Sequence, residues 1–112
     1  MSLRDALLAT ISAPPLPVNI EGFEQTVYIR PLSYREVIAQ QADTKDDGDK
    51  VALARGLCRV VVNADGTRAF DVDNPDDVAR AADLPWMLMQ AILAASAKQN
   101  GFVAPDDKEK NV

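Results

Sequence analysis

Residues 57–67 read Leu57-Cys58-Arg59-Val60-Val61-Val62-Asn63-Ala64-Asp65-Gly66-Thr67, an apolar run that ends in a turn signal. The start of this run continues a helical spacing of apolar residues that begins near Lys50, whereas its three valines are β-branched and favour a strand. We therefore predict a helix to about Val60 that passes into a short strand before Asp65-Gly66. Residues 68–70 then form the return arm of a small hairpin.

Two further helices are predicted downstream, each marked by a proline. Asn74 can cap the first helix, which has Pro75 at its first position and extends to about Ala82. The second covers residues 86–100, is apolar on most of its circumference and ends at Gly101, a residue that suits a helix C-terminus. We expect the rest of the chain to pack against residues 57–101 or to present them to a partner.

Upstream, the sequence predicts two helices with a hairpin between them. Residues 2–13 form a short amphipathic helix that the prolines of residues 14–17 end; we prefer a helix stop and linker here to a proline-rich docking peptide. Residues 17–31 form the hairpin, with its turn at 21–24. Ser33 and Glu36 make a capping box for a helix over residues 32–43, and a polar loop follows to residue 50.

These elements predict a small, single-domain α+β fold that is mostly helical, with one or two short antiparallel β-hairpins. We place the domain at residues 1–103 and a disordered charged tail at residues 104–112. The single cysteine, Cys58, lies in an apolar run and is interpreted as a small buried hydrophobe.

The charge balance argues against two classes of partner. The chain carries 12 basic and 17 acidic residues, a net charge of −5, and its basic residues are scattered. Nucleic acids and anionic membrane surfaces both select clustered Lys and Arg, so neither is an expected partner. No apolar run reaches the ~20 residues of a membrane span, and no export signal is evident.

The composition also argues against catalysis. The chain has no histidine, which excludes Ser-His-Asp and Cys-His arrangements, and one cysteine cannot form a zinc cage. An EF-hand starting at Asp43 would place Lys45 and Ala54 at ligand positions, and the cluster from Asp71 to Asp77 lacks the required Gly and closing Glu. We predict no enzyme activity, no catalytic, cofactor-binding or metal-binding residues, and no cofactor.

The order of these elements resembles the tail assembly chaperones of long-tailed, siphovirus-type bacteriophages. The resemblance covers nearly all of residues 3–102, and its specificity comes from the order and spacing of ordinary turn, cap and helix signals. Its residues are Val27-Tyr28-Ile29-Arg30-Pro31-Leu32-Ser33 with Tyr34-Arg35-Glu36, then Asp65-Gly66-Thr67-Arg68-Ala69-Phe70, Asp73-Asn74-Pro75-Asp76-Asp77-Val78, Leu84-Pro85 and Asn100-Gly101-Phe102.

The resemblance implies a small α+β protein that is made late in infection, acts in the host cytoplasm and is absent from the mature virion. It implies binding of the tape measure protein and assistance in recruiting tail tube subunits. It also implies a longer product made by ribosomal frameshifting, and residues 109–111, Glu-Lys-Asn, are compatible with a slippery heptamer. The family has no catalytic residues to carry over.

Two other functions remain as alternatives. One is a structural minor tail protein, a completion or connector protein that stays in the virion. The other is an acidic inhibitor that mimics nucleic acid, which requires one continuous acidic face. The acidic residues here fall into three separate clusters, so we rank this inhibitor below the other two functions.

The last predicted helix offers the candidate partner-binding residues. A long helical client is typically bound in a helix-in-groove mode, and methionine and tryptophan suit adaptable apolar contact. Packing against residues 3–11 and the hairpins is the competing use of this surface. Weak self-association is also expected of such a surface. The candidate residues are Trp86, Met87, Met89, Ile92 and Leu93.

Overall fold

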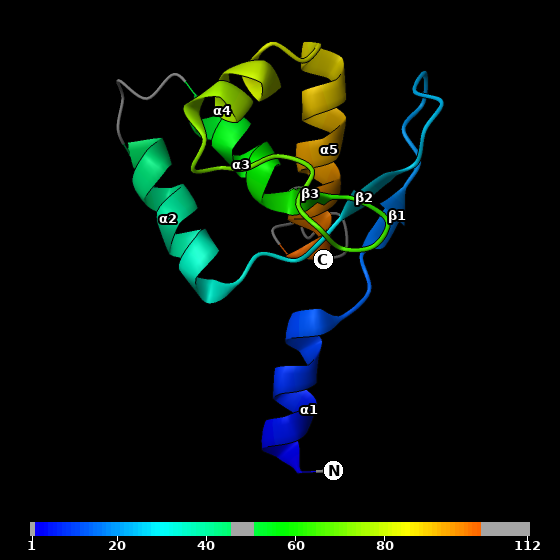
Figure 1. The fold of residues 1–112 in the computed structure, drawn as a ribbon, viewed down its shortest axis with the longest axis vertical. Coiled ribbons are helices and arrows are strands. Elements are labelled where there is room, and N and C mark those ends of the chain that lie inside the picture. The colour runs from blue at the N-terminus through cyan, green and yellow to red at the C-terminus, as the bar shows by residue number, and fades with distance from the viewer. Residues whose placement is uncertain (1, 46–50, 102–112) are drawn as a thin grey trace, which may run out of the picture.

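The computed structural model describes residues 2–45 and 51–101, and its fold is α+β and mostly helical, as the sequence predicts (Figure 1). The predicted disordered tail at 104–112, the end of the predicted loop at 46–50 and the slippery site at 109–111 lie outside these residues. In chain order the elements are α1 (Leu3–Ala9), the 3₁₀ turn η1 (Thr10–Ser12), β1 (Leu16–Val18), β2 (Val27–Ile29), α2 (Tyr34–Lys45), α3 (Ala52–Val60), β3 (Val61–Val62), α4 (Pro75–Ala82) and α5 (Trp86–Gln99).

The three strands form one antiparallel sheet in the order β1-β2-β3. The predicted hairpin is confirmed, with Leu16 opposite Ile29. The predicted passage from helix to strand at Val60 is also confirmed, but the main partner of β3 is β2, with Tyr28 opposite Val62. The predicted return arm contributes a single bridge, from Arg68 to Val62.

Pro17 occupies the open edge of this sheet. The Arg30 N–H donates to the Val60 carbonyl at 3.0 Å, so alternate residues of β2 point their hydrogen-bonding groups toward β3 and the intervening ones toward β1. In β1 the residues that bond to β2 are therefore the two that flank Pro17. Pro17 faces outward, where its missing N–H breaks no bond of the sheet.

Helix α3 is the centre of the core. It packs against α2, α4 and α5, and it lies between these helices in the ribbon (Figure 1). Its residues Leu57, Cys58 and Val60 are almost fully buried together with Ile29 of β2. The interpretation of Cys58 as a buried hydrophobe is therefore confirmed, and burial, aided by the nearby Asp77 carboxylate, raises the pKa of its thiol.

The local helix signals hold in the structure. Glu36 N–H donates to Ser33 Oγ at 3.2 Å and Ser33 N–H donates to Glu36 Oε1 at 2.9 Å, which completes the predicted capping box. Asn74 Oδ1 accepts from the Asp76 N–H at 2.9 Å, as expected for an N-cap. Gly101 has φ +81°, the left-handed conformation that favours glycine after a helix. Helix α2 extends two residues further than predicted, to Lys45.

One charged residue of α3 is buried, and one apolar residue of the same helix is exposed. Arg59 is only 7% exposed, whereas Leu53 is 46% exposed. Arg59 is buried because α2 supplies its partners. Its guanidinium donates to Asp43 Oδ2 at 2.7 Å and to Gln40 Oε1.

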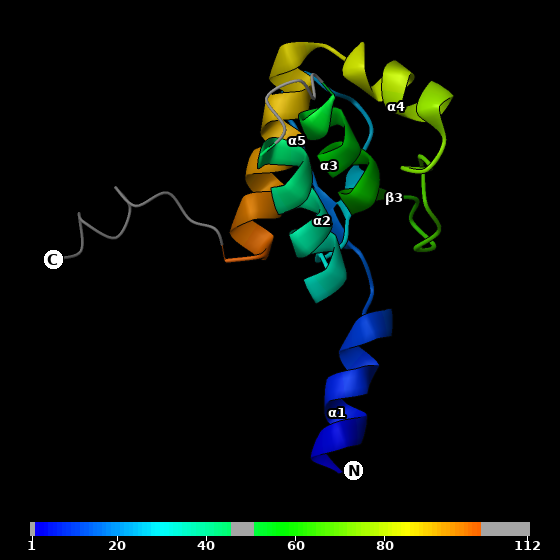
Figure 2. The same cartoon turned by 90° about the vertical axis from the view of Figure 1, so that its left-hand side faces the viewer.

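Helix α1 projects away from the rest of the domain and buries none of its residues (Figures 1 and 2). The alternative in which residues 3–11 cover the last helix is therefore wrong. The linker gives the physical reason. Ala13 and Pro14 each precede a proline, which disfavours helical backbone, and Ala13 is extended at φ −61° and ψ 147°. The chain consequently leaves α1 in a direction that separates it from the core.

Candidate functional site

The five candidate residues of α5 divide between its surface and the core. Met89 and Ile92 are 6% and 4% exposed and belong to the main hydrophobic cluster. Leu93 is partly buried against the same cluster. Trp86 and Met87 are 58% and 75% exposed at the first turn of the helix. We refer to this exposed pair as the α5 patch.

The structure positions the α5 patch through the residues that follow it. Leu84 and Pro85 bring the chain from α4 into α5, and the Met89 N–H donates to the Pro85 carbonyl at 3.0 Å. Met89 and Ile92 hold the helix in the core. Met87 lies on the opposite side of the helix, and Trp86 is exposed because it is the first residue of the helix, one turn before Met89. The patch is therefore presented by a well-packed element.

A second exposed apolar surface lies on the N-terminal helix. Its side chains Leu3, Leu7 and Ile11 follow one another at intervals of four residues, with Leu8 beside them, and they are 76%, 61%, 81% and 46% exposed respectively. The amphipathic pattern was predicted from the sequence, with packing against the last helix left open as one alternative. The run of prolines at residues 14–17 is the signal that could have placed it outside the core.

A groove of about 830 Å³ lies where this N-terminal helix joins the domain. One wall is formed by residues 10–15, the second by residues 30–33 and the third by Val62 and residues 64–67. The third wall is the predicted turn, in which the Asn63 N–H donates to the Thr67 carbonyl at 2.8 Å and Gly66 has φ +90°. This groove could not be predicted from the sequence, because its walls come from segments that are distant along the chain.

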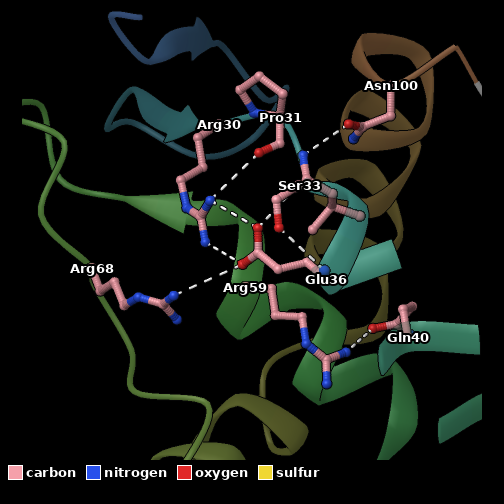
Figure 3. Close-up of polar contacts among 9 residues, drawn as sticks. Arg30, Pro31, Ser33, Glu36, Gln40, Arg59, Arg68 and Asn100 are labelled. Carbon is pink, nitrogen blue, oxygen red and sulfur yellow. Dashed lines mark hydrogen bonds and ion pairs between the residues drawn. The ribbon is translucent and has the colours of Figure 1, made fainter. Parts of the chain in front are cut away.

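Arg30, Glu36 and Arg68 form the charged cluster beside this groove (Figure 3). Arg30 Nη1 donates to Glu36 Oε1 at 3.0 Å, Arg30 Nη2 pairs with Glu36 Oε2, and Arg68 Nη2 lies 3.8 Å from the latter oxygen. Burial alone would raise the pKa of Glu36, but the hydrogen bonds from Arg30 and Ser33 together with the Arg30 charge lower it below its ordinary value. The cluster is a structural ion pair that joins the sheet to α2.

Two kinds of arrangement were sought within residues 2–45 and 51–101, a metal site and a membrane-spanning helix. Across those ranges no group of three or more His, Cys, Asp or Glu side chains is placed to hold a metal ion. In the same part of the chain, no helix combines the length and the apolar character needed to cross a membrane.

A comparison with family models identifies one family. The model described as "Phage tail assembly chaperone, TAC" matches residues 3–96 of the chain. The match includes the sheet, all of α2 to α4 and most of α5. No curated protein and no solved structure matches the chain.

Proposed function

The chain belongs to the phage tail assembly chaperone family, and we propose that it binds the tape measure protein and assists the recruitment of tail tube subunits. Membership of this family indicates a non-enzymatic role with protein partners in tail assembly. The proposal extends this role to two named partners, to action in the host cytoplasm and to absence from the mature virion.

The exposure of the α5 patch is the observation that carries the proposal. Trp86 and Met87 offer a large aromatic face and a flexible thioether on a helix that the core holds in place. Such side chains make adaptable apolar contacts with a helical client. The patch is held in place by the packing of the same helix into the core through Met89, Ile92 and Leu93. Of these three, Leu93 is also partly exposed.

Self-association and a longer frameshifted product are further parts of the proposal. The exposed apolar side chains of α1 support weak association of two copies. The codons for Lys110 and Asn111 test the frameshift site directly, since a gene without the slippery heptamer there excludes this position.

Co-purification with tape measure protein tests the central claim. We expect Met87→Asp to reduce the captured tape measure protein several-fold, because a charge replaces an apolar contact. Gln90→Asp is the matched control, since Gln90 is an exposed polar residue one turn away on the same helix. Equal capture by wild type and Met87→Asp would contradict the proposal.

Mass spectrometry of purified virions separates the assembly role from the structural alternative. We expect no peptide of this chain in mature particles, because an assembly factor leaves before the tail is complete. A stoichiometric amount in the virion would instead support a completion or connector protein.

A further inference from the structure

The apolar row of α1 and the groove at its base form one continuous surface. The row consists of Leu3, Leu7 and Ile11, which are all exposed, and the groove of about 830 Å³ begins at the same Ile11. Much of the groove wall is also apolar, with contributions from residues 13–15, residues 31–32 and Val62. Helix α1 leaves the domain at this point and buries none of its residues (Figure 1). A partner that covers the row therefore reaches the groove as well.

The row is symmetrical about Leu7. Leu3 and Ile11 each lie four residues from Leu7, so they flank it on the same side of the helix. Two antiparallel copies of the row then face each other with Leu7 opposite Leu7 and with Leu3 opposite Ile11 at both ends. All of these pairs are apolar, and this self-complementarity is what a contact with two-fold symmetry requires.

The charges of α1 favour the antiparallel arrangement over the parallel one. The charged residues of this helix, Arg4 and Asp5, both lie in its first turn, where they are exposed and 3.7 Å apart as an ion pair. A parallel pair would bring like charges and the positive ends of both helix dipoles together. An antiparallel pair instead places each charged first turn beside the uncharged residues Thr10–Ser12 of the other copy.

We propose that a second copy of this chain covers this surface, with its α1 antiparallel to the first α1 and with its Leu3 at the mouth of the groove. The inference rests on the self-association included in the proposed function, and it specifies the geometry of that contact. Leu3 and Ile11 are eight residues apart, which is about 12 Å of helix. When the two Leu7 side chains meet, Leu3 of the second copy therefore lies at Ile11, where the groove begins.

The linker keeps α1 available for such a contact. The extended backbone at Ala13, followed by Pro14 and Pro15, directs α1 away from its own domain (Figures 1 and 2). The contact is reciprocal, so each copy supplies one row and one groove. It involves few side chains and should bury less than the roughly 1,200 Å² of a stable interface, so the pair should dissociate on dilution.

Disulfide trapping between two single variants tests the arrangement. Full chains with Leu3→Cys and with Ile11→Cys are mixed in equal amounts at a concentration at which light scattering shows association, then oxidised and analysed by peptide mass spectrometry. Cysteine is a small hydrophobe and keeps the row apolar. The control mixes Asp5→Cys with Ala9→Cys, because these positions are also symmetrical about Leu7 but lie on the other side of the helix. Native Cys58 is 1% exposed and does not compete.

We expect the 3–11 disulfide in about ten-fold higher yield than the 3–3 or the 11–11 disulfide, because disulfide geometry is specific. Random encounter gives only about a two-fold excess of the mixed product, and we expect this ratio for the control pair. A random ratio for the 3–11 disulfide would overturn the proposal, and an excess of 3–3 and 11–11 disulfides would show a parallel pair instead. The purified chains contain no tape measure protein, so this result is separate from the capture experiment with Met87→Asp.

NMR spectroscopy tests the occupancy of the groove. Thr67 lies in the groove wall. Replacement of Leu3 by Ala should shift the amide signal of Thr67 in concentrated protein but not in dilute protein, because only Leu3 of a second copy reaches the groove. The amide signal of Arg80 in α4 should stay unchanged at both concentrations. No shift at Thr67, or the same shift at both concentrations, would overturn the placement of Leu3.

Discussion

The guanidinium of Arg30 holds both carboxylate oxygens of Glu36, the same side chain that completes the N-terminal cap of α2. One carboxylate therefore joins the end of β2 to the start of α2 and satisfies the Ser33 N–H as well. Glu36 is mostly buried, so its charge depends on these partners.

Replacement of this carboxylate gives the first prediction. We expect Glu36→Gln to lower the free energy of unfolding by roughly 1.5–3 kcal/mol, the range for a hydrogen bond to a charged group. Urea denaturation measures this change. Glu24→Gln is the control, because Glu24 is exposed. An equal, small effect of both substitutions would mean that the ion pair contributes nothing to stability.

The lowered pKa of Glu36 predicts a pH dependence. A carboxyl with a folded pKa below its ordinary value of 4.5 contributes stability above that pH and loses it as the pH falls through the folded pKa. The stability difference between wild type and Glu36→Gln should therefore be constant near neutral pH and shrink below about pH 4.5. Denaturation curves over a pH series measure it, and a difference that stays constant as the pH falls well below 4.5 would contradict the assignment.

Whether Gly56→Ala raises or lowers the free energy of unfolding depends on the neighbouring side chain of Gln40. A Cβ at this position would lie 3.0 Å from Gln40 Oε1, which accepts from the buried Arg59. Gly→Ala inside a helix normally gains about 1 kcal/mol. Here we expect Gly56→Ala to destabilise the protein, because Gln40 must move and weaken a hydrogen bond to a charged group.

A double-mutant cycle tests this explanation. In a Gln40→Ala background the steric conflict is absent, so Gly56→Ala should become stabilising by up to about 1 kcal/mol. Thermal or urea denaturation of the four proteins gives the coupling energy. If Gly56→Ala has the same effect in both backgrounds, Gln40 does not determine it.

The two methionines of α5 provide a direct test of its orientation. Met87→Asp should change the free energy of unfolding by less than about 0.5 kcal/mol, as is usual for an exposed residue. Met89→Asp should prevent folding or destabilise the domain severely, since it buries an unpaired charge. Circular dichroism melting curves distinguish the two, and similar losses would mean that both positions are in the core.

Self-association should depend on α1. We expect light scattering to show weak, concentration-dependent oligomers in wild type and fewer in Leu7→Asp, because Leu7 is exposed in the apolar row of that helix. Arg4→Asp is the control on the same helix. A strict monomer at high concentration would count against this prediction.

The sequence predicted those features that short-range chemistry determines. The capping box of Ser33 and Glu36 and the N-cap at Asn74 require only residues two or three apart, so the pattern alone identifies them. The strand after Val60 was also predictable, but its pairing with β2 was not, because the alternation of residues does not specify a partner thirty or more positions away.

Burial was harder to predict for a charged residue that is buried and for an apolar residue that is exposed. Arg59 is buried because Asp43 and Gln40 of another helix meet its guanidinium, which no local pattern indicates. Helix α5 is apolar on most of its circumference, so its sequence could not distinguish the buried Met89 from the exposed Met87. The fold class was therefore predictable, whereas the division of α5 into core and surface required the tertiary structure.

The outward-facing Pro17 determines how this sheet can grow. A free strand edge templates further strands through its row of N–H donors, which is the first step of fibrillar assembly and of domain swapping through strands. At the open edge of β1 the outward-facing residue is Pro17, which has no N–H that could donate to an added strand. Addition of a strand at this edge is therefore disfavoured. Contacts of the exposed apolar helices with other chains should be made by side chains, and such contacts should be reversible.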